Sequence, residues 1–232
     1  MSSALIIGAR NFGFAIAERL LTDGWEVTAG ARSPDTLARV REAGAQAVET
    51  DVLDPESVRA ALTAAAAASG RVDLVVNAAS PYGGRREGPF GGGPLSQAEP
   101  EAFDSWAALP ARGAFSFLSA SARFLREQGG DATIVQVTGG SARRAMPGRG
   151  LWAAGAFAVR ALTQSAALEL REHGIHVALL IVDARIDRSD SQDRDSADPA
   201  SLAAAVAYLA SQSPRAMTHE LQVTPALDNW TP

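Results

Sequence analysis

The opening stretch ALIIGARNFGFAIAERLL (residues 4–21) passes from a short apolar run, through a turn with two glycines, into an amphipathic segment. An apolar run of this length fits a buried strand, and the apolar spacing after Phe12 fits a helix. Gly8 permits a tight turn between the two, and Gly13 permits the helix to pack closely. The stretch therefore predicts a strand, a glycine turn and a helix, which together begin an α/β fold.

The same alternation continues along the chain. Strands separated by helices need crossover connections, which specify a parallel sheet covered on both faces. With 232 residues and no interdomain linker, the whole chain (1–232) is expected to be a single-domain, Rossmann-type, doubly wound parallel sheet. Strands are expected within residues 4–7, 27–29, 47–48, 74–76, 134–137 and 176–182, and helices within 12–21, 34–43, 55–68, 101–126, 151–170 and 202–210.

Composition excludes several classes of function. A net charge of -5 disfavours nucleic-acid binding, which needs clustered basic residues. The chain has no cysteine, which excludes disulfides and cysteine-ligated metals. His173, His176 and His219 match no common metal site. No signal peptide or membrane span is indicated. We therefore expect a cytoplasmic protein without metal, nucleic-acid or membrane partners.

The glycine turn also predicts a nucleotide site. Gly8 and Gly13 match the outer glycines of G-x-G-x-x-G, with Arg10 at the middle position. The N-terminus of the following helix offers unpaired N–H groups to a diphosphate. Arg32 follows the second strand, where an acidic residue would bind the ribose of NAD, and with Arg10 it favours a 2′-phosphate. We expect NADP(H) rather than NAD(H); the alternative is glycines that only shape a turn and arginines that are only solvated.

With these features the sequence resembles the short-chain dehydrogenase/reductase (SDR) family over nearly the whole chain. Its glycine motif is matched with one residue deleted and Asn11 at the central glycine, and Asp51-Val52 resembles the pair that contacts adenine. Asn77-Ala78-Ala79 resembles the N-A-G motif, and residues 158–187 resemble the helix and strand after the active site. The expected cofactor-binding residues are Gly8, Arg10, Asn11, Phe12, Gly13, Arg32, Asp51, Val52, Asn77, Ala78, Ala79 and Ile186.

The catalytic motif of that family has no counterpart in this alignment. Trp152 stands at the tyrosine of Y-x-x-x-K and Ala156 at its lysine, while Gly139 stands at the serine and Pro110 at the helix asparagine. An indole N–H cannot release a proton at accessible pH, and alanine has neither charge nor donor. The usual proton relay is therefore not expected. The candidates for residual catalytic roles near the pocket are Trp152, for which packing is the favoured role, Thr138, Ser141 and Tyr82.

Two irregular segments follow strand ends, where doubly wound sheets bind ligands. Residues 80–100 are rich in Gly and Pro, and residues 187–199 are polar. Both are expected to be mobile loops, either plain connections or substrate lids. Arg143, Arg144 and Arg149 fit either a clamp for an anionic substrate or a solvated basic loop, and the solvated loop is favoured.

Three functions remain compatible with the sequence. The preferred one is an atypical NADP(H)-dependent oxidoreductase that transfers hydride to a small molecule without the Tyr/Lys relay. The alternatives are a redox-neutral isomerase or cyclase, and a non-catalytic NADP(H)-binding regulatory protein. Whether the chain is an enzyme is left open at this point. The resemblance further implies a homodimer or homotetramer, packed through the helices near residues 106–125 and 151–170.

Overall fold

The computed structural model describes residues 2–80, 88–187 and 193–228. These residues form a seven-stranded sheet in the order β3-β2-β1-β4-β5-β6-β7, in which every neighbouring pair is parallel. The strand order reverses between β1 and β4, so the crevice at their carboxyl ends is where such a sheet binds ligands. The strands are β1 (Ser3–Ile7), β2 (Glu26–Ala31), β3 (Gln46–Glu49), β4 (Leu74–Asn77), β5 (Ala132–Gly139), β6 (Ile175–Val182) and β7 (Glu220–Val223).

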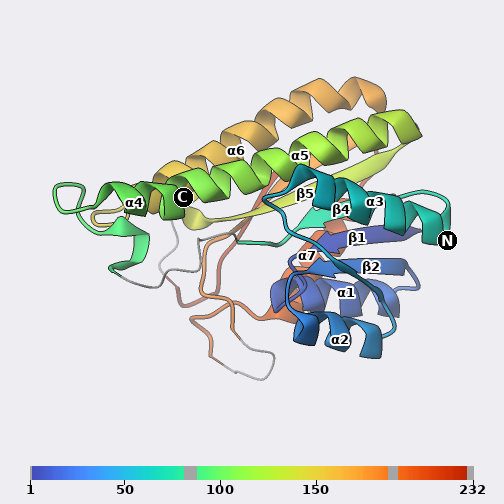
Figure 1. Ribbon diagram of the computed structural model, residues 1–232, viewed down its shortest axis with the longest axis horizontal. Helices are drawn as coiled ribbons and strands as arrows, with labels where there is room; N and C mark the ends of the chain where they lie inside the picture. The colour runs from blue at the N-terminus through green and yellow to red at the C-terminus, as the bar shows by residue number, and fades with distance from the viewer. Residues whose placement is uncertain (1, 81–87, 188–192, 229–232) are drawn as a thin grey trace.

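Helices cover both faces of the sheet (Figure 1). One face carries α1 (Phe12–Thr22), α2 (Pro34–Glu42) and α7 (Pro199–Ala210). The other carries α3 (Pro55–Ser69), α5 (Leu109–Gln128) and α6 (Gly150–Leu170). The doubly wound architecture expected from the alternating pattern is therefore confirmed. The short elements are η1 (Phe90–Gly92), α4 (Pro100–Phe103), the π-helical turn η2 (Asp104–Ala108), η3 (Gly140–Ala142) and η4 (Arg171–His173).

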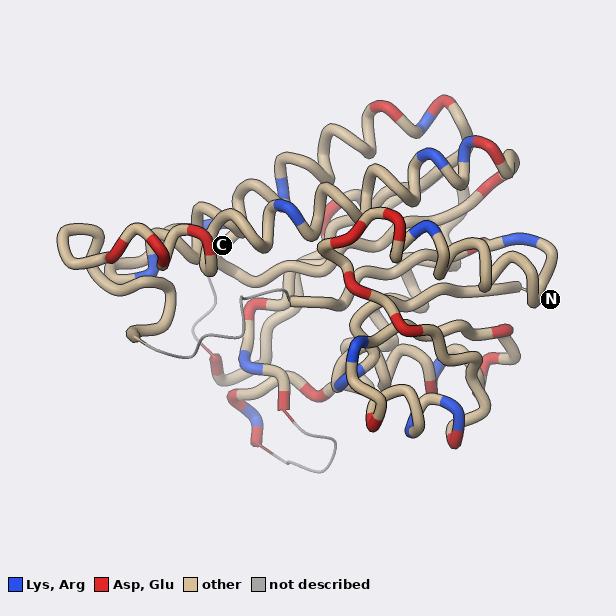
Figure 2. Tube along the Cα trace, in the orientation of Figure 1, with Lys and Arg blue, Asp and Glu red and all other residues tan. Residues whose placement is uncertain are grey.

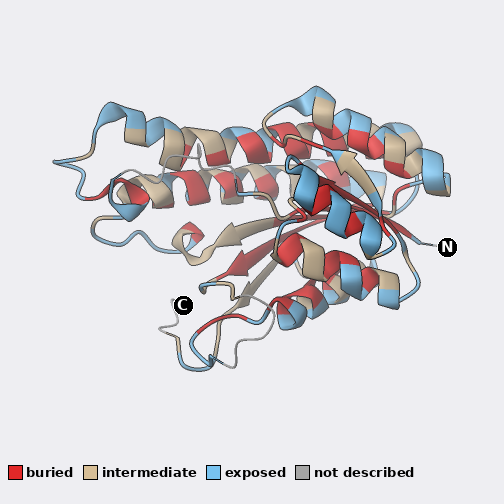
Figure 3. Ribbon diagram, turned by 60° about the horizontal axis from the view of Figure 1, so that its bottom comes forward, coloured by how far each residue is buried: buried red, intermediate tan, exposed pale blue. Residues whose placement is uncertain are grey.

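The core has two halves, one on each face of the sheet. In β1, Ala4 and Ile6 pack with α1 and α7, while Leu5 and Ile7 pack with α3 and α5. Both sides of the strand are buried, which explains why its sequence is continuously apolar rather than alternating. Figure 3 shows the buried residues on the inward sides of the helices, and Figure 2 shows that charged residues lie mainly on helices and loops.

The seventh strand was not expected from the sequence. β7 is only four residues long, and each of its residues is half-buried at the edge of the sheet. Such a strand shows neither the continuous apolar run of a central strand nor a long period-two alternation. Its position is fixed by pairing with the carboxyl half of β6, from Leu179↔Glu220 to Val182↔Val223.

A π-helical turn adapts the long helical segment to Pro110. The segment expected over residues 101–126 consists of α4, η2 and α5, and η2 ends two residues before Pro110. Proline has no N–H to give the carbonyl four residues earlier, that of Trp106. A Cβ on Gly155 of α6 would lie 2.6 Å from this carbonyl oxygen. α6 therefore crosses close to the turn, and glycine is what permits the approach.

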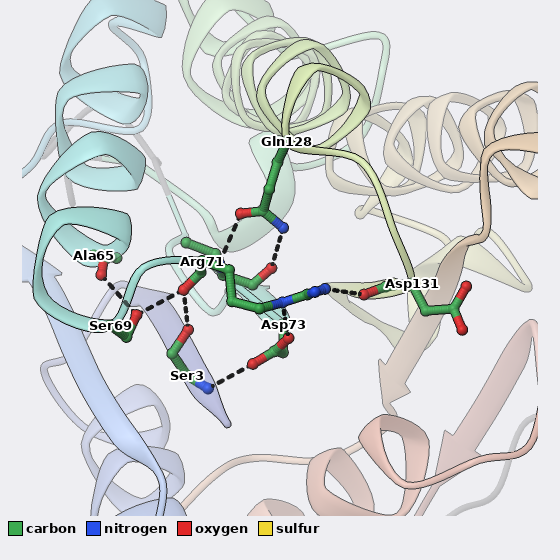
Figure 4. Close-up of polar contacts among 8 residues, drawn as sticks. Ser3, Ala65, Ser69, Arg71, Asp73, Gln128 and Asp131 are labelled. Carbon is green, nitrogen blue, oxygen red and sulfur yellow. Dashed lines mark hydrogen bonds and ion pairs between the residues drawn. The ribbon is translucent and has the colours of Figure 1, made fainter. Parts of the chain in front are cut away.

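A polar network holds the amino-terminal edge of the sheet, opposite the ligand-binding edge (Figure 4). The amide of Gln128 at the end of α5 accepts from the Val72 N–H at 2.7 Å and donates to the Val72 carbonyl at 3.0 Å. Arg71 pairs with Asp73 at 2.6 Å and donates to the Asp131 carbonyl at 2.7 Å. The end of α5 is thus fixed to the segment that enters β4.

A buried histidine predicts that the fold loses stability in mild acid. His176 in β6 is 4% exposed, and its Nε2 is 3.0 Å from the Thr218 carbonyl oxygen. Burial lowers the pKa of His176 and nearby His219 lowers it further, while the hydrogen bond to Thr218 opposes both effects. The pKa of His176 in the folded protein is thus below the unfolded value of about 6.5. The neutral ring therefore contributes its full stability above about pH 6.5, and this contribution declines as the pH falls toward the folded pKa.

Unfolding free energies of wild type and His176→Gln, measured from neutral pH down to about pH 5, test this linkage. The variant is expected to show a shallower pH dependence because it lacks the titrating ring. His173→Gln is the matched control, since His173 is exposed, and it should keep the wild-type slope. Identical slopes in wild type and His176→Gln would contradict the prediction.

Candidate functional site

The glycine turn lies directly against the end of β4. Gly8 has φ +96°, and a Cβ there would lie 2.4 Å from the backbone nitrogen of Ala79. A Cβ on Gly13 would lie 2.5 Å from the carbonyl oxygen of Gly8. The turn is therefore folded tightly between β1, α1 and β4, at the switch point of the sheet, and both glycines are needed for this approach.

The N-terminus of α1 carries no side-chain cap. Asn11 is the residue before the helix, and its side chain caps no first-turn N–H; its Nδ2 donates to the carbonyl of Asp187 at 3.2 Å. This contact joins the glycine turn to the segment after β6. Of the first-turn N–H groups of α1, that of Phe14 bonds to the Asn11 carbonyl at 3.0 Å, while those of Phe12 and Gly13 have no hydrogen-bond partner among the described residues. These two groups and the positive end of the helix dipole are available at the cavity that Asn11 and Phe12 line.

A cavity surrounds this helix end, and two arginines line it. Arg10 and Arg32 are both exposed, and one guanidinium nitrogen of Arg32 is 3.7 Å from Asp51 Oδ2. Arg39 donates to the Arg10 carbonyl and stacks on the Phe14 ring, which supports the turn from outside. We call this the glycine-turn cavity; it is lined by Ile7, Gly8, Arg10, Asn11, Phe12, Ala31, Arg32, Ser33, Thr36, Thr50, Asp51, Val52, Ala78, Ala79, Ser80 and Ile186.

Most of the expected cofactor-binding residues meet in this cavity. Gly13 lies beneath the turn, and Asn77 lines the next cavity instead. Sequence reasoning missed Ser33, Thr36 and Thr50. Their neighbours Arg32 and Asp51 were the signal: side chains beside a residue at the carboxyl end of a strand share the same edge of the sheet.

A second cavity continues from the first. Ala78, Ala79, Ser80 and Ile186 line both cavities, so the two form one cleft. We call the second, of about 170 Å³, the Trp152 cavity. It is lined by Asn77, Ala78, Ala79, Ser80, Pro110, Ala114, Gln136, Val137, Thr138, Gly139, Trp152, Ala156, Val159, Val182, Ala184 and Ile186.

Side-chain amides fix the floor of the Trp152 cavity. Asn77 Nδ2 donates to Gln136 Oε1 at 3.0 Å, which joins the ends of β4 and β5. Asn77 Oδ1 accepts from the Ala79 N–H at 3.1 Å, and Gln136 Nε2 donates to the Val137 carbonyl at 2.8 Å. Both amides are buried, so these bonds satisfy groups that would be costly to leave unpaired.

An aromatic cluster forms the wall of this cavity on the α6 side. The Trp152 ring packs against Phe90 and Trp106, with ring centroids 4.8 Å and 5.7 Å away. Phe90 and Trp106 are themselves 5.0 Å apart in an edge-to-face arrangement. Trp152 Cζ2 would lie 3.5 Å from a Cβ on Gly139. These contacts hold the indole over the end of β5, so Trp152 both packs in a cluster and lines the cavity.

The catalytic candidates do not all meet at this place. Thr138 and Trp152 line the cavity, and so do Ala156 and Pro110. Ser141 lies in η3 and is not among the lining residues that the structure describes, and Tyr82 lies outside the described residues. None of the described lining residues of the Trp152 cavity has an ionisable side chain.

Neither a lysine nor Tyr208 can take the place of the family's Tyr/Lys pair at this cavity. The chain contains no lysine. Its other tyrosine, Tyr208, is exposed in α7, where its hydroxyl is 3.4 Å from Thr218 Oγ1.

Arg143, one of the three arginines considered for an anion clamp, lies near a carboxylate of the protein itself, that of Glu220. Glu220 in β7 makes two 2.8 Å contacts with Arg160 of α6 and lies 3.9 Å from Arg143. Arg160 also donates to the carbonyl of Ala142 in η3 at 3.2 Å. Among the described lining residues of both cavities, Arg143, Arg144 and Arg149 do not appear.

Glu220 is expected to stabilise the contact between β7 and α6 through its ion pair with Arg160. Its partial burial alone would raise its pKa, but hydrogen bonds from Arg160 and Gln164 and the charges of Arg160 and Arg143 outweigh burial and lower it. Glu220→Gln should cost about 1–3 kcal/mol of unfolding free energy near pH 7, because a charge-assisted pair is lost. The difference from wild type should shrink as the pH falls through the lowered pKa, where the wild-type carboxylate also becomes neutral.

Denaturant titration at several pH values measures this difference. Glu172→Gln is the control, because Glu172 is exposed in η4, and it should stay close to wild type. A Glu220→Gln deficit that persists unchanged in acid would mean that packing, rather than charge, carries the effect.

The fold and the cleft together define the class: a Rossmann-type protein whose glycine turn, uncapped helix end and switch-point crevice are arranged for a dinucleotide. The chain belongs to the short-chain dehydrogenase family, whose profile matches residues 2–194. No helix in the described part of the chain is long and apolar enough to cross a membrane. Across residues 2–80, 88–187 and 193–228, no group of three His, Asp or Glu side chains could hold a metal ion.

Individual relatives agree with this assignment. The chain is 31% identical over 179 residues to a sorbitol dehydrogenase of Cereibacter sphaeroides, covering 75% of this chain and 67% of the relative. It is 31% identical over 180 residues to the 2-(R)-hydroxypropyl-CoM dehydrogenase of Xanthobacter autotrophicus, covering 74% and 70%. The crystal structure of a metagenomic short-chain oxidoreductase in complex with NADP superposes with a TM-score of 0.78, at 27% identity over 98% of both chains.

Proposed function

We propose that this protein is an NADP(H)-dependent oxidoreductase that transfers hydride without the Tyr/Lys proton relay of its family. One observation carries the proposal: a single cleft runs from Arg10 and Arg32 to a cavity whose wall contains Trp152 and Ala156. The first end suits a phosphorylated dinucleotide. The second has no ionisable side chain among its described lining residues, so it suits an acceptor that needs no acid from the protein.

The residues of the glycine-turn cavity fit the cofactor. The diphosphate would bind at the uncapped N-terminus of α1, beside Gly8. Arg32 and Arg10 would bind the 2′-phosphate, and Val52 and Asp51 would lie against the adenosine. Ile186 and Ala184 would border the nicotinamide. A family relative solved with NADP supports a nicotinamide dinucleotide in this cleft, and the choice of NADP(H) over NAD(H) rests on Arg10 and Arg32.

When bound, NADPH supplies two electrons as a hydride, which is chemistry of the cofactor rather than of the protein. The proton that completes the reduction would come from water, because the Trp152 indole is not an acid at accessible pH and no described residue lining the cavity is ionisable. This limits the reaction to activated acceptors, such as an enone or an imine. The chain's own contribution is to bind, orient and shield: the amides of Asn77 and Gln136 fix the floor, and the aromatic cluster covers one side.

Titration of the purified protein with NADPH and NADH, followed by absorbance assays with neutral enones and imines, tests the proposal. We expect preferential NADPH binding and loss of NADPH absorbance that depends on the acceptor. Turnover without any change in absorbance would favour a redox-neutral isomerase or cyclase instead. Tight NADPH binding without turnover across the panel would favour a regulatory binding protein. Absence of dinucleotide binding would reject both the oxidoreductase and the NADP(H)-binding regulatory protein.

We also propose that the protein is a homo-oligomer that packs through α5 and α6. Phe115 and Phe157 are 58% and 42% exposed on these helices, and Leu168 is exposed as well. Light scattering of the intact chain should give at least twice the 24.1 kDa monomer mass. The double variant Phe115→Glu/Phe157→Glu should shift this mass toward the monomer, and a monomeric wild type would contradict the proposal.

A further inference from the structure

We propose that the Trp152 cavity binds an uncharged, mainly apolar group carrying one hydrogen-bonding oxygen, and that the α5–α6 end of the cavity selects this class of substrate. The inference deepens the proposed function. It rests on that function for the fate of the bound molecule, although the binding itself can be measured without it.

Two helices make an apolar end to the cavity. Pro110 and Ala114 come from α5, and Ala156 and Val159 come from α6. Ala114, Ala156 and Val159 are buried, and yet they line the cavity, so this end reaches deep between the two helices and the sheet. Their side chains are small and carry no polar atom. This end of the cavity therefore offers contact to hydrocarbon and nothing to a charged or strongly hydrated group.

The polar side chains near this end are mostly occupied. The amides of Asn77 and Gln136 bond to each other and to the backbone, as described above. Within the described residues, the hydroxyls of Thr138 and Ser80 have no hydrogen-bond partner; Thr138 lies at the end of β5, whereas Ser80 is exposed and lines both cavities. A hydroxyl can both donate and accept. Thr138 can thus hold one carbonyl or hydroxyl oxygen of the bound molecule.

A carboxylate would find no partner at this end. Arg143 is held near Glu220, and Arg149 lies over the Phe90 ring at 5.3 Å from its centroid. Neither is among the described residues that line the cavity. A carboxylate that enters would lose hydration without gaining an opposite charge, which is strongly unfavourable. The cavity therefore discriminates against anions by desolvation.

The volume limits the size of the bound group. The cavity measures about 170 Å³, and an apolar cavity of about 150 Å³ is known to admit benzene. The deeply bound part is therefore no larger than about one six-membered ring or an equivalent short chain, because a nicotinamide bordered by Ala184 and Ile186 would take up part of the same volume.

A matched pair of probes tests the inference. Cyclohexanone is neutral and carries one oxygen, whereas cyclohexanecarboxylate is similar in shape and charged. We expect ligand-observed NMR on the full chain to give saturable binding of cyclohexanone, and binding of the carboxylate at least about tenfold weaker. Equal or tighter binding of the carboxylate would overturn the inference.

Variants locate the binding within the cavity. Ala156→Leu fills the α5–α6 end and should weaken cyclohexanone binding at least about tenfold. Ala154→Leu makes the same change on the exposed side of α6 and should leave cyclohexanone binding at the wild-type value. If Ala156→Leu does not fold, Thr138→Val provides the test, because the isosteric loss of the hydroxyl should weaken cyclohexanone binding severalfold. Wild-type affinity in a folded Ala156→Leu or Thr138→Val variant would overturn the inference.

NADPH affinity, measured on the same samples, separates this inference from the proposed function. Cyclohexanone binding that obeys these rules without NADPH binding would support the inference and reject the proposed cofactor. NADPH binding without any cyclohexanone binding would overturn the inference and leave the cofactor proposal standing.

Discussion

Replacing Arg32 by alanine is expected to weaken NADPH binding by about 10- to 100-fold, because a charge-assisted contact to phosphate contributes about 1.5–3 kcal/mol. Arg32 lines the glycine-turn cavity at the end of β2, and its guanidinium is 3.7 Å from the carboxylate of Asp51. The variant would therefore lose a positive charge and leave a negative one facing the 2′-phosphate. Isothermal titration of wild type and variant with NADPH measures the change.

NADH serves as the internal control for this experiment. It lacks the 2′-phosphate, so Arg32→Ala should leave its affinity unchanged or slightly improved. Asp51→Asn should raise the affinity for NADPH, since it removes the negative charge beside the 2′-phosphate. Equal losses of NADPH and NADH affinity in Arg32→Ala would indicate damage to the cavity as a whole and would count against NADP(H) as the preferred cofactor.

Replacing Gly8 by alanine is expected to destabilise the fold by about 3–5 kcal/mol and to abolish dinucleotide binding. Two effects add at this position. Its φ of +96° is unfavourable for any residue with a Cβ, and that Cβ would lie 2.4 Å from the backbone nitrogen of Ala79. Neither backbone segment can retreat without shifting β1 or β4 in the middle of the sheet. Urea unfolding, monitored by circular dichroism, measures the loss.

Gly24→Ala separates the two effects. Gly24 has φ +82°, and nothing lies within 4 Å of a Cβ placed there. This variant should lose only about 1–2 kcal/mol, which is the conformational cost without the collision. If Gly8→Ala were no less stable than Gly24→Ala, the close approach of the glycine turn to β4 would not matter energetically.

Local patterns predicted most of the fold because its central elements are long and strongly apolar. β6 and α6 fall within one residue of the expected ranges, since each is bounded by a clear change in hydrophobicity. β7 was not predicted, because a short edge strand is stabilised by pairing with its neighbour rather than specified by its own sequence pattern. η2 was not expected either, because its π-helical turn depends on a proline further along the helix rather than on its own sequence.

The candidate site was predictable at the level of single residues but not of contacts. Arg10 and Arg32 follow different strands, yet the sequence predicted that both serve one phosphate, and both line the glycine-turn cavity. The Phe90–Trp106–Trp152 cluster was not foreseen, because its members are far apart in the sequence and only the folded chain brings them together. Likewise, the sequence left Arg143 either solvated, which was favoured, or part of an anion clamp, whereas an edge strand outside the expected sheet places Glu220 3.9 Å from it.

The anchoring of Gln128 to Val72 restricts how the sequence of α5 can change. One end of this helix is bound at the amino edge of the sheet, while Pro110 and Ala114 near its other end face the Trp152 cavity. Each residue of an α-helix turns the chain by about 100° and advances it by about 1.5 Å. A single insertion between the two ends would rotate that wall away from the cavity, so α5 can accept substitutions on its outer side but not a change of length.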